Sequence, residues 1–255
     1  RQLVHQPAFV EERHEDQPAR HLVATLGLHR QLDLAAARGH LDLHATLDAT
    51  RLCVVGVHEE LGLGHGAVQF GHAALHQAGV QHTLYADVLA DPPEARVLEA
   101  VSAACADGAD GVVGFGGGSS LDTAKLVALL ARSPQPLADI YGVGLAQGER
   151  LPLIQVPTTA GTGSEVTPIS IVTTPGHEKK GVVSPLLLPD IALLDSRLTL
   201  GLPPAISAMT GVDAMVHAIE AYTSRLRKNP LSDALSVQSL QLLYANLPRV
   251  LADGQ

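Results

Sequence analysis

The sequence predicts an α/β protein, in which a parallel sheet covered by helices is followed by an incomplete all-helical domain. Short apolar segments alternate with amphipathic helical segments from about residue 74 onwards, and this alternation is typical of parallel sheets. Three glycines, Gly116 to Gly118, stand where an apolar strand meets a helix. After Leu202-Pro203-Pro204 the apolar spacing is helical throughout.

The first two strand–helix pairs follow one another directly. A strand is expected over 83–88, and a helix begins near Asp91-Pro92-Pro93, because proline suits the first turn of a helix. Gly108 ends that helix. A strand over 111–115 then leads through the glycine turn into a helix over 120–132. Apolar spacing predicts that the buried face of the first helix consists of Val97, Leu98, Val101, Ala104 and Cys105.

Three further strands and two long helices complete the pattern. The strands are expected over 153–156, 169–173 and 191–195. The helices are expected over 205–226 and 231–251. Ser232 or Asp233 would cap the last helix, because short polar side chains accept hydrogen bonds from the first free N–H groups.

The predicted domain boundary falls near residue 203. Residues 1–203 are assigned to the α/β domain, within which 1–73 match poorly, and 204–255 to the start of the helical domain. Residues 1–82 contain 11 of the 13 histidines. We interpret them as surface residues rather than metal ligands, and the stretch as a segment that is either irregular or foreign to the domain. The candidates weighed for a metal were His40, His44 and His58.

Composition excludes several classes of function. The chain has 255 residues and a net charge of −9. Because nucleic-acid binding needs clustered Lys and Arg, which are lacking, no nucleic-acid partner is expected. No apolar stretch approaches the roughly 20 residues that cross a bilayer. Two cysteines give no disulfide framework. Without an apolar leader segment, a soluble cytoplasmic protein is expected.

Residues 114–125, Gly-Phe-Gly-Gly-Gly-Ser-Ser-Leu-Asp-Thr-Ala-Lys, carry the strongest functional signal. Glycine lets a ligand approach the backbone closely. The helix that follows directs free N–H groups and its positive dipole end at the same point. This turn is therefore predicted to bind a phosphate of a nucleotide.

Residues 157–168, Pro-Thr-Thr-Ala-Gly-Thr-Gly-Ser-Glu-Val-Thr-Pro, form a second signal. Open α/β sheets bind ligands at the carboxyl ends of their strands. Hydroxyl groups and free N–H groups in this loop would suit phosphate, ribose or a carboxamide, and the alternative is an ordinary polar loop.

Asp213 and His217 form the third signal, because four residues of separation place both on one helix face. A carboxylate and an imidazole can hold two positions around a divalent ion. Two ligands do not complete a site, and a plain helix-surface pair is the alternative.

Together these segments resemble the iron-containing (group III) alcohol dehydrogenase family. The matching residues are GFGGGSSLDTAK at 114–125, PTTAGTGSEVTP at 157–168 and TGVDAMVHAIEAY at 210–222, with a similar linking segment at 188–204. The match covers roughly residues 74–255. Three motifs in the right order are far more specific than a lone glycine motif.

The resemblance implies NAD or NADP between the two domains and a divalent metal, Fe2+ or Zn2+, on the helical side. The cofactor diphosphate would rest on Gly117, Gly118, Ser119 and Ser120. Further cofactor contacts would come from Asp122, Thr158, Thr159, Thr162, Thr167 and Lys179, with Lys180 as the alternative to Lys179. Asp213 and His217 match the first two metal ligands. The metal would stabilise the alkoxide of a small-molecule alcohol while hydride passes to the nicotinamide.

The sequence departs from the family pattern in three places. The two further histidine ligands of the family do not follow Asp213 within this chain, so a fragment that binds metal poorly is expected. Leu240, Leu243 and Leu247 would lack their usual cover. Glu59 or Glu60 would read the adenosine ribose, favouring NAD, and Asp91 stands where the family usually has asparagine.

The leading hypothesis is a metal-dependent alcohol dehydrogenase acting on an alcohol or aldehyde, with oligomeric state left open and a homo-oligomer allowed. A maleylacetate reductase, which works without the metal, is a related alternative. A nucleotide-binding fragment without catalytic activity is an alternative of a different class.

Overall fold

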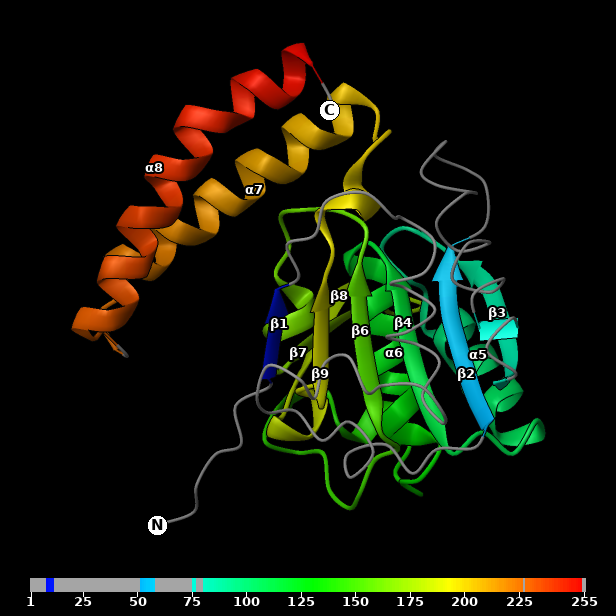
Figure 1. The fold of residues 1–255 in the computed structure, drawn as a ribbon. Coiled ribbons are helices and arrows are strands. Elements are labelled where there is room, and N and C mark those ends of the chain that lie inside the picture. The colour runs from blue at the N-terminus through cyan, green and yellow to red at the C-terminus, as the bar shows by residue number, and fades with distance from the viewer. Residues whose placement is uncertain (1–7, 12–50, 58–74, 77–79, 227, 254–255) are drawn as a thin grey trace.

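A six-stranded parallel sheet forms the centre of the computed structural model, which describes residues 8–11, 51–57, 75–76, 80–226 and 228–253 (Figure 1). The strand order is β1-β9-β6-β4-β2-β3, and every neighbouring pair is parallel. In that order the strands are Ala8–Glu11, Ile191–Leu194, Leu153–Pro157, Gly111–Gly116, Arg51–Val57 and Gln81–Val88. The parallel sheet with helices on it confirms the predicted fold class.

Helix α6, Gly118–Leu130, is buried from two sides. It packs on β4 of the large sheet and also contacts β7, which belongs to a second sheet. Nine of its residues are buried. A helix that is apolar on all sides belongs in the interior, which explains why Leu121, Leu126 and Leu129 on different faces are all covered.

The second sheet has the order β5-β8-β7. Its strands are Gly142–Val143, Lys179–Val183 and Ile169–Thr173. The sequence predicted the 169–173 strand but neither of the other two strands, nor its antiparallel pairing with β8. The burial of β7 does not follow its hydrophobicity throughout, because Ser170 and Val172 are buried while Ile169 and Ile171 are exposed. The buried Ser170 hydroxyl donates to the Asp122 carbonyl oxygen at 3.0 Å.

Helix α5, Glu94–Ala106, begins after Pro93 and ends before Gly108, as predicted. Its predicted buried face is wrong at two positions, because Leu98 and Cys105 are exposed. The buried residues of α5 are Val97, Ala100 and Ala104. They form a stripe at spacings of three and four that packs toward the sheet and α6.

Helices α7, Pro204–Thr223, and α8, Pro230–Ala252, pack against each other as a hairpin beyond the edge at which the strands end (Figure 1). The change from sheet to helices thus falls at Pro204, and the division into two domains stays a prediction. The cap of α8 is Asn229, not Ser232 or Asp233, because its side chain accepts from the Leu231 and Ser232 N–H groups at 3.1 and 2.9 Å.

The apolar faces of the hairpin differ from the expectation. Leu240, Leu243 and Leu247 are half-buried rather than uncovered, and the Leu247 methyl groups lie against Gly211 of α7. The exposed apolar residues lie elsewhere on the two helices and include Met209, Val212, Leu231, Leu235, Leu242 and Tyr244. Among the described residues, no helix is both long and apolar enough to cross a membrane.

Candidate functional site

The two predicted ligand segments lie side by side because their strands are neighbours. Strands β4 and β6 pair in parallel, with Gly116 opposite Pro157. The carboxyl ends of both strands therefore meet at one edge, where α/β sheets bind ligands. The Thr158 N–H donates to the Gly116 carbonyl oxygen at 2.9 Å, which joins the two segments where they leave the sheet.

Threonine side chains lie directly on the glycine turn. A Cβ atom at Gly118 would stand 3.0 Å from the Thr162 side chain, and one at Gly117 would stand 3.5 Å from that of Thr159. A Cβ at Gly118 would press on Thr162, whereas one at Gly117 would make an ordinary contact with Thr159. The structure thus places Thr159 and Thr162 beside the turn, and their contact with a cofactor stays a prediction.

The first turn of α6 contributes Ser119 and Ser120 at the same place. Gly117 precedes the helix in an extended conformation, without a side-chain cap. The free N–H groups of this first turn are the donors that suit an anion. The Ser120 side chain is buried, and its Oγ has no hydrogen-bond partner among the described residues. A buried hydroxyl without a partner is costly in a folded protein, so this position fits a ligand that supplies one.

Asp122 lies against the loop over residues 158–168, which we call the second loop, rather than against an unoccupied position. One carboxylate oxygen accepts from the Ser164 hydroxyl at 2.5 Å and lies 3.4 Å from the Lys125 Nζ. The other accepts from the Ile171 N–H at 2.9 Å. Asp122 was predicted to contact the cofactor, but both oxygens of its carboxylate already accept hydrogen bonds from within the chain.

Lys125 is fully buried one turn further along α6. Its Nζ donates to the Ser164 Oγ at 2.8 Å, the Ile169 carbonyl oxygen at 2.7 Å and the Thr167 Oγ1 at 3.3 Å. Burial lowers the pKa of Lys125, while the Asp122 carboxylate opposes that shift. Thr167, predicted as a cofactor contact, thus lies against Lys125.

Glu165, in the same loop, has a pKa raised mainly by burial. Its backbone hydrogen bond and the nearby Lys125 charge act in the opposite direction. The loop therefore carries a partly buried acid, and it lies against the fully buried Lys125 of α6.

Lys179 is held at the surface by Asp91. Its Nζ lies 2.7 Å from Asp91 Oδ1, and the two side chains are 60% and 67% exposed. Asp91 lies in the loop after β3 and has a positive φ of 50°. Lys180 instead stands 5.6 Å above the centre of the Tyr141 ring.

Helix α7 comes into contact with the second loop at Gly161. A Cβ there would stand 2.4 Å from the Thr210 carbonyl oxygen, so the backbones touch. Asp213 lies three residues beyond Thr210, on the same side of the helix. The Asp213 Oδ1 and His217 Nε2 are 3.7 Å apart, and both side chains are about half exposed.

The described residues contain no group of three His, Cys, Asp or Glu that could hold a metal ion. The pair Asp213 and His217 is therefore brought together as predicted, without a third donor in that part of the chain. The other metal and ribose candidates, His40, His44, His58, Glu59 and Glu60, lie outside the described residues.

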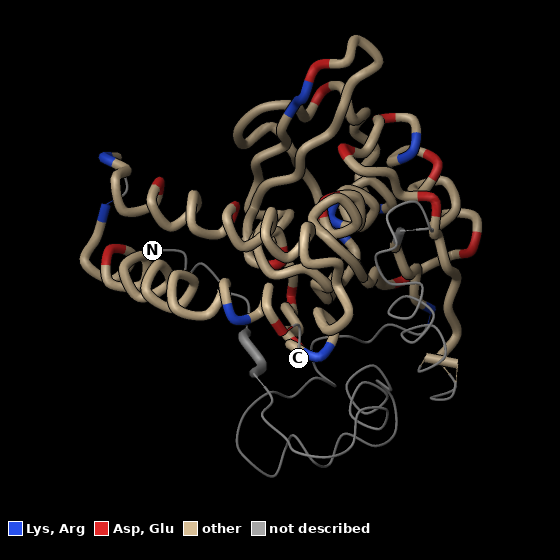
Figure 2. The backbone as a smooth tube through the Cα atoms, turned by 90° about the horizontal axis from the view of Figure 1, so that it is seen from above, with Lys and Arg blue, Asp and Glu red and all other residues tan. Residues whose placement is uncertain are grey.

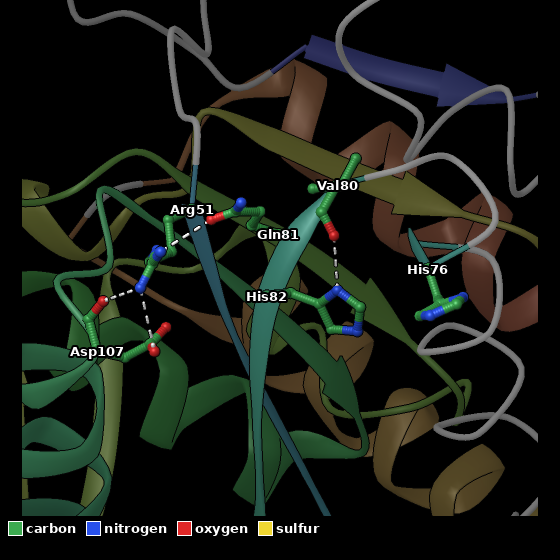
Figure 3. Close-up of a pocket in the computed structure, with 6 residues that line it drawn as sticks. All are labelled: Arg51, His76, Val80, Gln81, His82 and Asp107. Carbon is green, nitrogen blue, oxygen red and sulfur yellow. Dashed lines mark hydrogen bonds and ion pairs between the residues drawn. The ribbon is translucent and has the colours of Figure 1, made fainter.

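A separate cavity of about 450 Å³ lies at the opposite edge of the sheet, where β2 and β3 begin (Figure 3). Arg51 lines it and donates to the Asp107 carbonyl oxygen at 2.9 Å and to Gln81 Oε1 at 2.8 Å. None of the predicted site residues lines this cavity.

Seen from above, basic residues in the described chain are scattered among acidic ones rather than gathered on one face (Figure 2).

Sequence reasoning missed Lys125, Ser164 and Gly161 as members of this site. One signal was available for Lys125. It is the first lysine of the chain and stands in the later part of α6, where the other residues from 124 to 130 are all apolar. A lysine in such a helix needs buried partners, and these are the loop residues just described.

Two family models match most of the chain. A family model described as iron-containing alcohol dehydrogenase matches residues 40–196, and the model of that family's C-terminal part matches residues 207–255. Sulfoacetaldehyde reductase of Bilophila wadsworthia is 42% identical over 183 residues, which are 71% of this chain and 47% of the relative. The chain spans about half the length of the curated relatives it matches.

Solved structures with the same fold are similar over most of the chain. An alcohol dehydrogenase from Oenococcus oeni has a TM-score of 0.79 at 29% identity, covering 91% of this chain and 57% of the other. The sulfoacetaldehyde reductase from Bifidobacterium kashiwanohense, solved in complex with NAD+, has a TM-score of 0.72 at 29% identity, covering 82% and 54%.

Proposed function

Since the chain belongs to the iron-containing alcohol dehydrogenase family, we propose that it binds NAD(P) and serves hydride transfer between a small alcohol or aldehyde and the nicotinamide. The observation that carries the proposal is the glycine turn at the start of α6, with the buried, unpartnered Ser120 hydroxyl beside it. The diphosphate of a dinucleotide supplies the acceptor that this hydroxyl and the first N–H groups of α6 require.

The surroundings of the turn support this proposal. Gly117 and Gly118 carry no side chain, and the side chains of Thr159 and Thr162 lie about 3.0–3.5 Å from the positions that Cβ atoms would take. A phosphate in contact with the turn would therefore meet the backbone N–H groups of α6, with the threonines close enough to contact the adjoining part of the ligand. This arrangement suits an anion better than a neutral ligand.

In the proposed reaction the chain binds the dinucleotide and orients its nicotinamide. The α6 N-terminus with Ser119 and Ser120 would hold the diphosphate, and Thr158, Thr159 and Thr162 would fix the ribose or nicotinamide half. Lys179 would add a positive charge at the surface. The bound nicotinamide supplies the hydride chemistry, and the protein supplies distance and angle.

Asp213 and His217 are proposed as two donors to a divalent ion, Fe2+ or Zn2+. Metal sites of this kind use three or four protein ligands. The described residues supply these two and no group of three, so they do not form a complete site, and we derive no step of the reaction through a metal.

The proposal is tested by fluorescence titration of the chain with NADH, followed by an alcohol oxidation assay with added Fe2+ or Zn2+. We expect saturable NADH binding that ADP-ribose competes for. Binding without turnover would support the nucleotide-binding half of the proposal alone. A chain that is folded by circular dichroism and leaves NADH fluorescence unchanged would refute it.

A further inference from the structure

Lys125 is a buried cation whose partners all come from outside the glycine turn. Its side chain is 0% exposed. Two of its four acceptors, the Ser164 Oγ and the Ile169 carbonyl oxygen, lie within 2.8 Å of the Nζ. Asp122, three residues earlier on the same helix, supplies the counter-charge at 3.4 Å. We call Asp122, Lys125, Ser164 and Thr167 the Lys125 cluster.

The Lys125 cluster joins one side of α6 to residues 164–171 through hydrogen bonds. Asp122 accepts hydrogen bonds from the Ser164 hydroxyl and the Ile171 N–H. Its carbonyl oxygen accepts from Ser170. Charged groups taken out of water are stable only when they are paired and hydrogen-bonded, so each member requires the others to stay in place.

A short path of contacts leads from this cluster to the glycine turn. Lys125 donates to the Ser164 hydroxyl, and the Ser164 N–H donates to Thr162 Oγ1 at 3.3 Å. The Thr162 side chain in turn lies on Gly118, at 3.0 Å from the position of a Cβ. The placement of Thr162 on the turn therefore depends on Ser164, and the placement of Ser164 depends on Lys125 and Asp122.

We propose that Lys125 and Asp122 are positioning residues, which set the affinity for the dinucleotide through Ser164 and Thr162 without touching it. This inference rests on the proposed function, because it concerns the same ligand. It differs from the motif-based expectation that Asp122 contacts the cofactor. Lys125 is fully buried, and both carboxylate oxygens of Asp122 already accept hydrogen bonds from Ser164 and Ile171. Both residues therefore act on a ligand at the turn through the segment that they hold.

The mildest test is Ser164→Ala, which removes one hydroxyl and leaves the Lys125 contact with the Ile169 carbonyl oxygen. We expect NADH to bind roughly tenfold more weakly, because the hydroxyl that holds Ser164, and with it Thr162, in place against Lys125 and Asp122 is lost. Amide hydrogen exchange should become faster over residues 158–171 and stay unchanged in β4. Ser164→Thr keeps the hydroxyl and should restore most of the affinity, which a purely structural role of the site would not require.

A second variant covers the case in which a single charge change unfolds the chain. Asp122→Leu with Lys125→Met replaces both charged groups by apolar ones, which buried ion pairs often tolerate. We expect this double variant to fold and to bind NADH at least tenfold more weakly. Lys228→Met, at an exposed lysine that pairs with Asp233 in the helical hairpin, is the matched control and should bind NADH like the unaltered chain.

The outcomes separate the two proposals. If folded Ser164→Ala and double variants bind NADH as tightly as the unaltered chain, the positioning role is refuted while the proposed function stands. If Ser164→Ala and Ser164→Thr instead lose the same affinity, the path through the Ser164 hydroxyl is refuted. If the unaltered chain itself binds no NADH, the proposed function fails and the positioning role fails with it.

Discussion

Ser120 offers the sharpest test of the cofactor site at the level of single residues. Its hydroxyl is buried without a partner among the described residues, so Ser120→Ala should leave the melting temperature unchanged or slightly higher. The same change should weaken NADH binding roughly tenfold, because a hydrogen bond to phosphate is lost. Melting curves and NADH titration measure both effects.

Ser133→Ala is the matched control for that experiment. Ser133 is also buried, but its hydroxyl donates to the Gln147 carbonyl oxygen at 3.2 Å. We expect the control to be destabilised and to bind NADH normally. Equal NADH affinity in Ser120→Ala and the unaltered chain would contradict the proposed diphosphate contact.

Asp91 is the second residue with a testable role, because its carboxylate forms an ion pair with the Lys179 ammonium group. Asp91→Asn should release the Lys179 ammonium group for an anionic ligand and strengthen binding of both NADH and NADPH, by up to about fivefold. The effect should shrink in 1 M salt, where exposed charges are screened over about 3 Å. Stability should change by less than about 1 kcal/mol, since the pair is mostly exposed.

Glu178→Gln gives the matched control for Asp91→Asn. Glu178 is also an exposed acid next to a lysine, with its Oε2 4.0 Å from the Lys180 Nζ. If the two variants strengthen NADPH binding equally, the gain comes from general charge and not from releasing Lys179.

Contacts between elements depend on Gly161, where the second loop meets α7. Gly161→Ala places a Cβ only 2.4 Å from the Thr210 carbonyl oxygen, which is too close for an unstrained contact. Backbone cannot yield as a side-chain tip does, so we expect a loss of about 1–3 kcal/mol in unfolding free energy. Urea denaturation measures it. Gly176→Ala, whose nearest neighbour is 3.9 Å away, should cost far less, and a similar loss there would contradict the contact.

Predictability from the sequence also differs from element to element. Strand β4 and helix α6 were foreseen because a continuous apolar run and three glycines mark them without ambiguity. The second sheet was foreseen only in β7. Strands β5 and β8 were missed, since β5 has two residues and β8 begins with two exposed lysines. The Lys125 cluster escaped for a different reason. A lysine in a helix normally reaches solvent, and its buried partners lie about 40 residues further along the chain.

At the scale of the whole molecule, the donor set for a metal is the property most open to measurement. Asp213 and His217 are adjacent, and the described residues offer no group of three donors. We therefore expect calorimetric titration with Zn2+ or Fe2+ to show weak binding, abolished in His217→Ala. Tight stoichiometric binding that survives His217→Ala would show that other residues bind the ion.

The position of α6 between two sheets has a consequence for redesign of coenzyme preference. Because nine residues of this helix are buried, larger or charged replacements beyond its first turn would disrupt packing on both sides. Attempts to exchange one coenzyme for another thus have two places to work with. These are the exposed Ala160 of the threonine loop and the pair Asp91 and Lys179, where side chains face water.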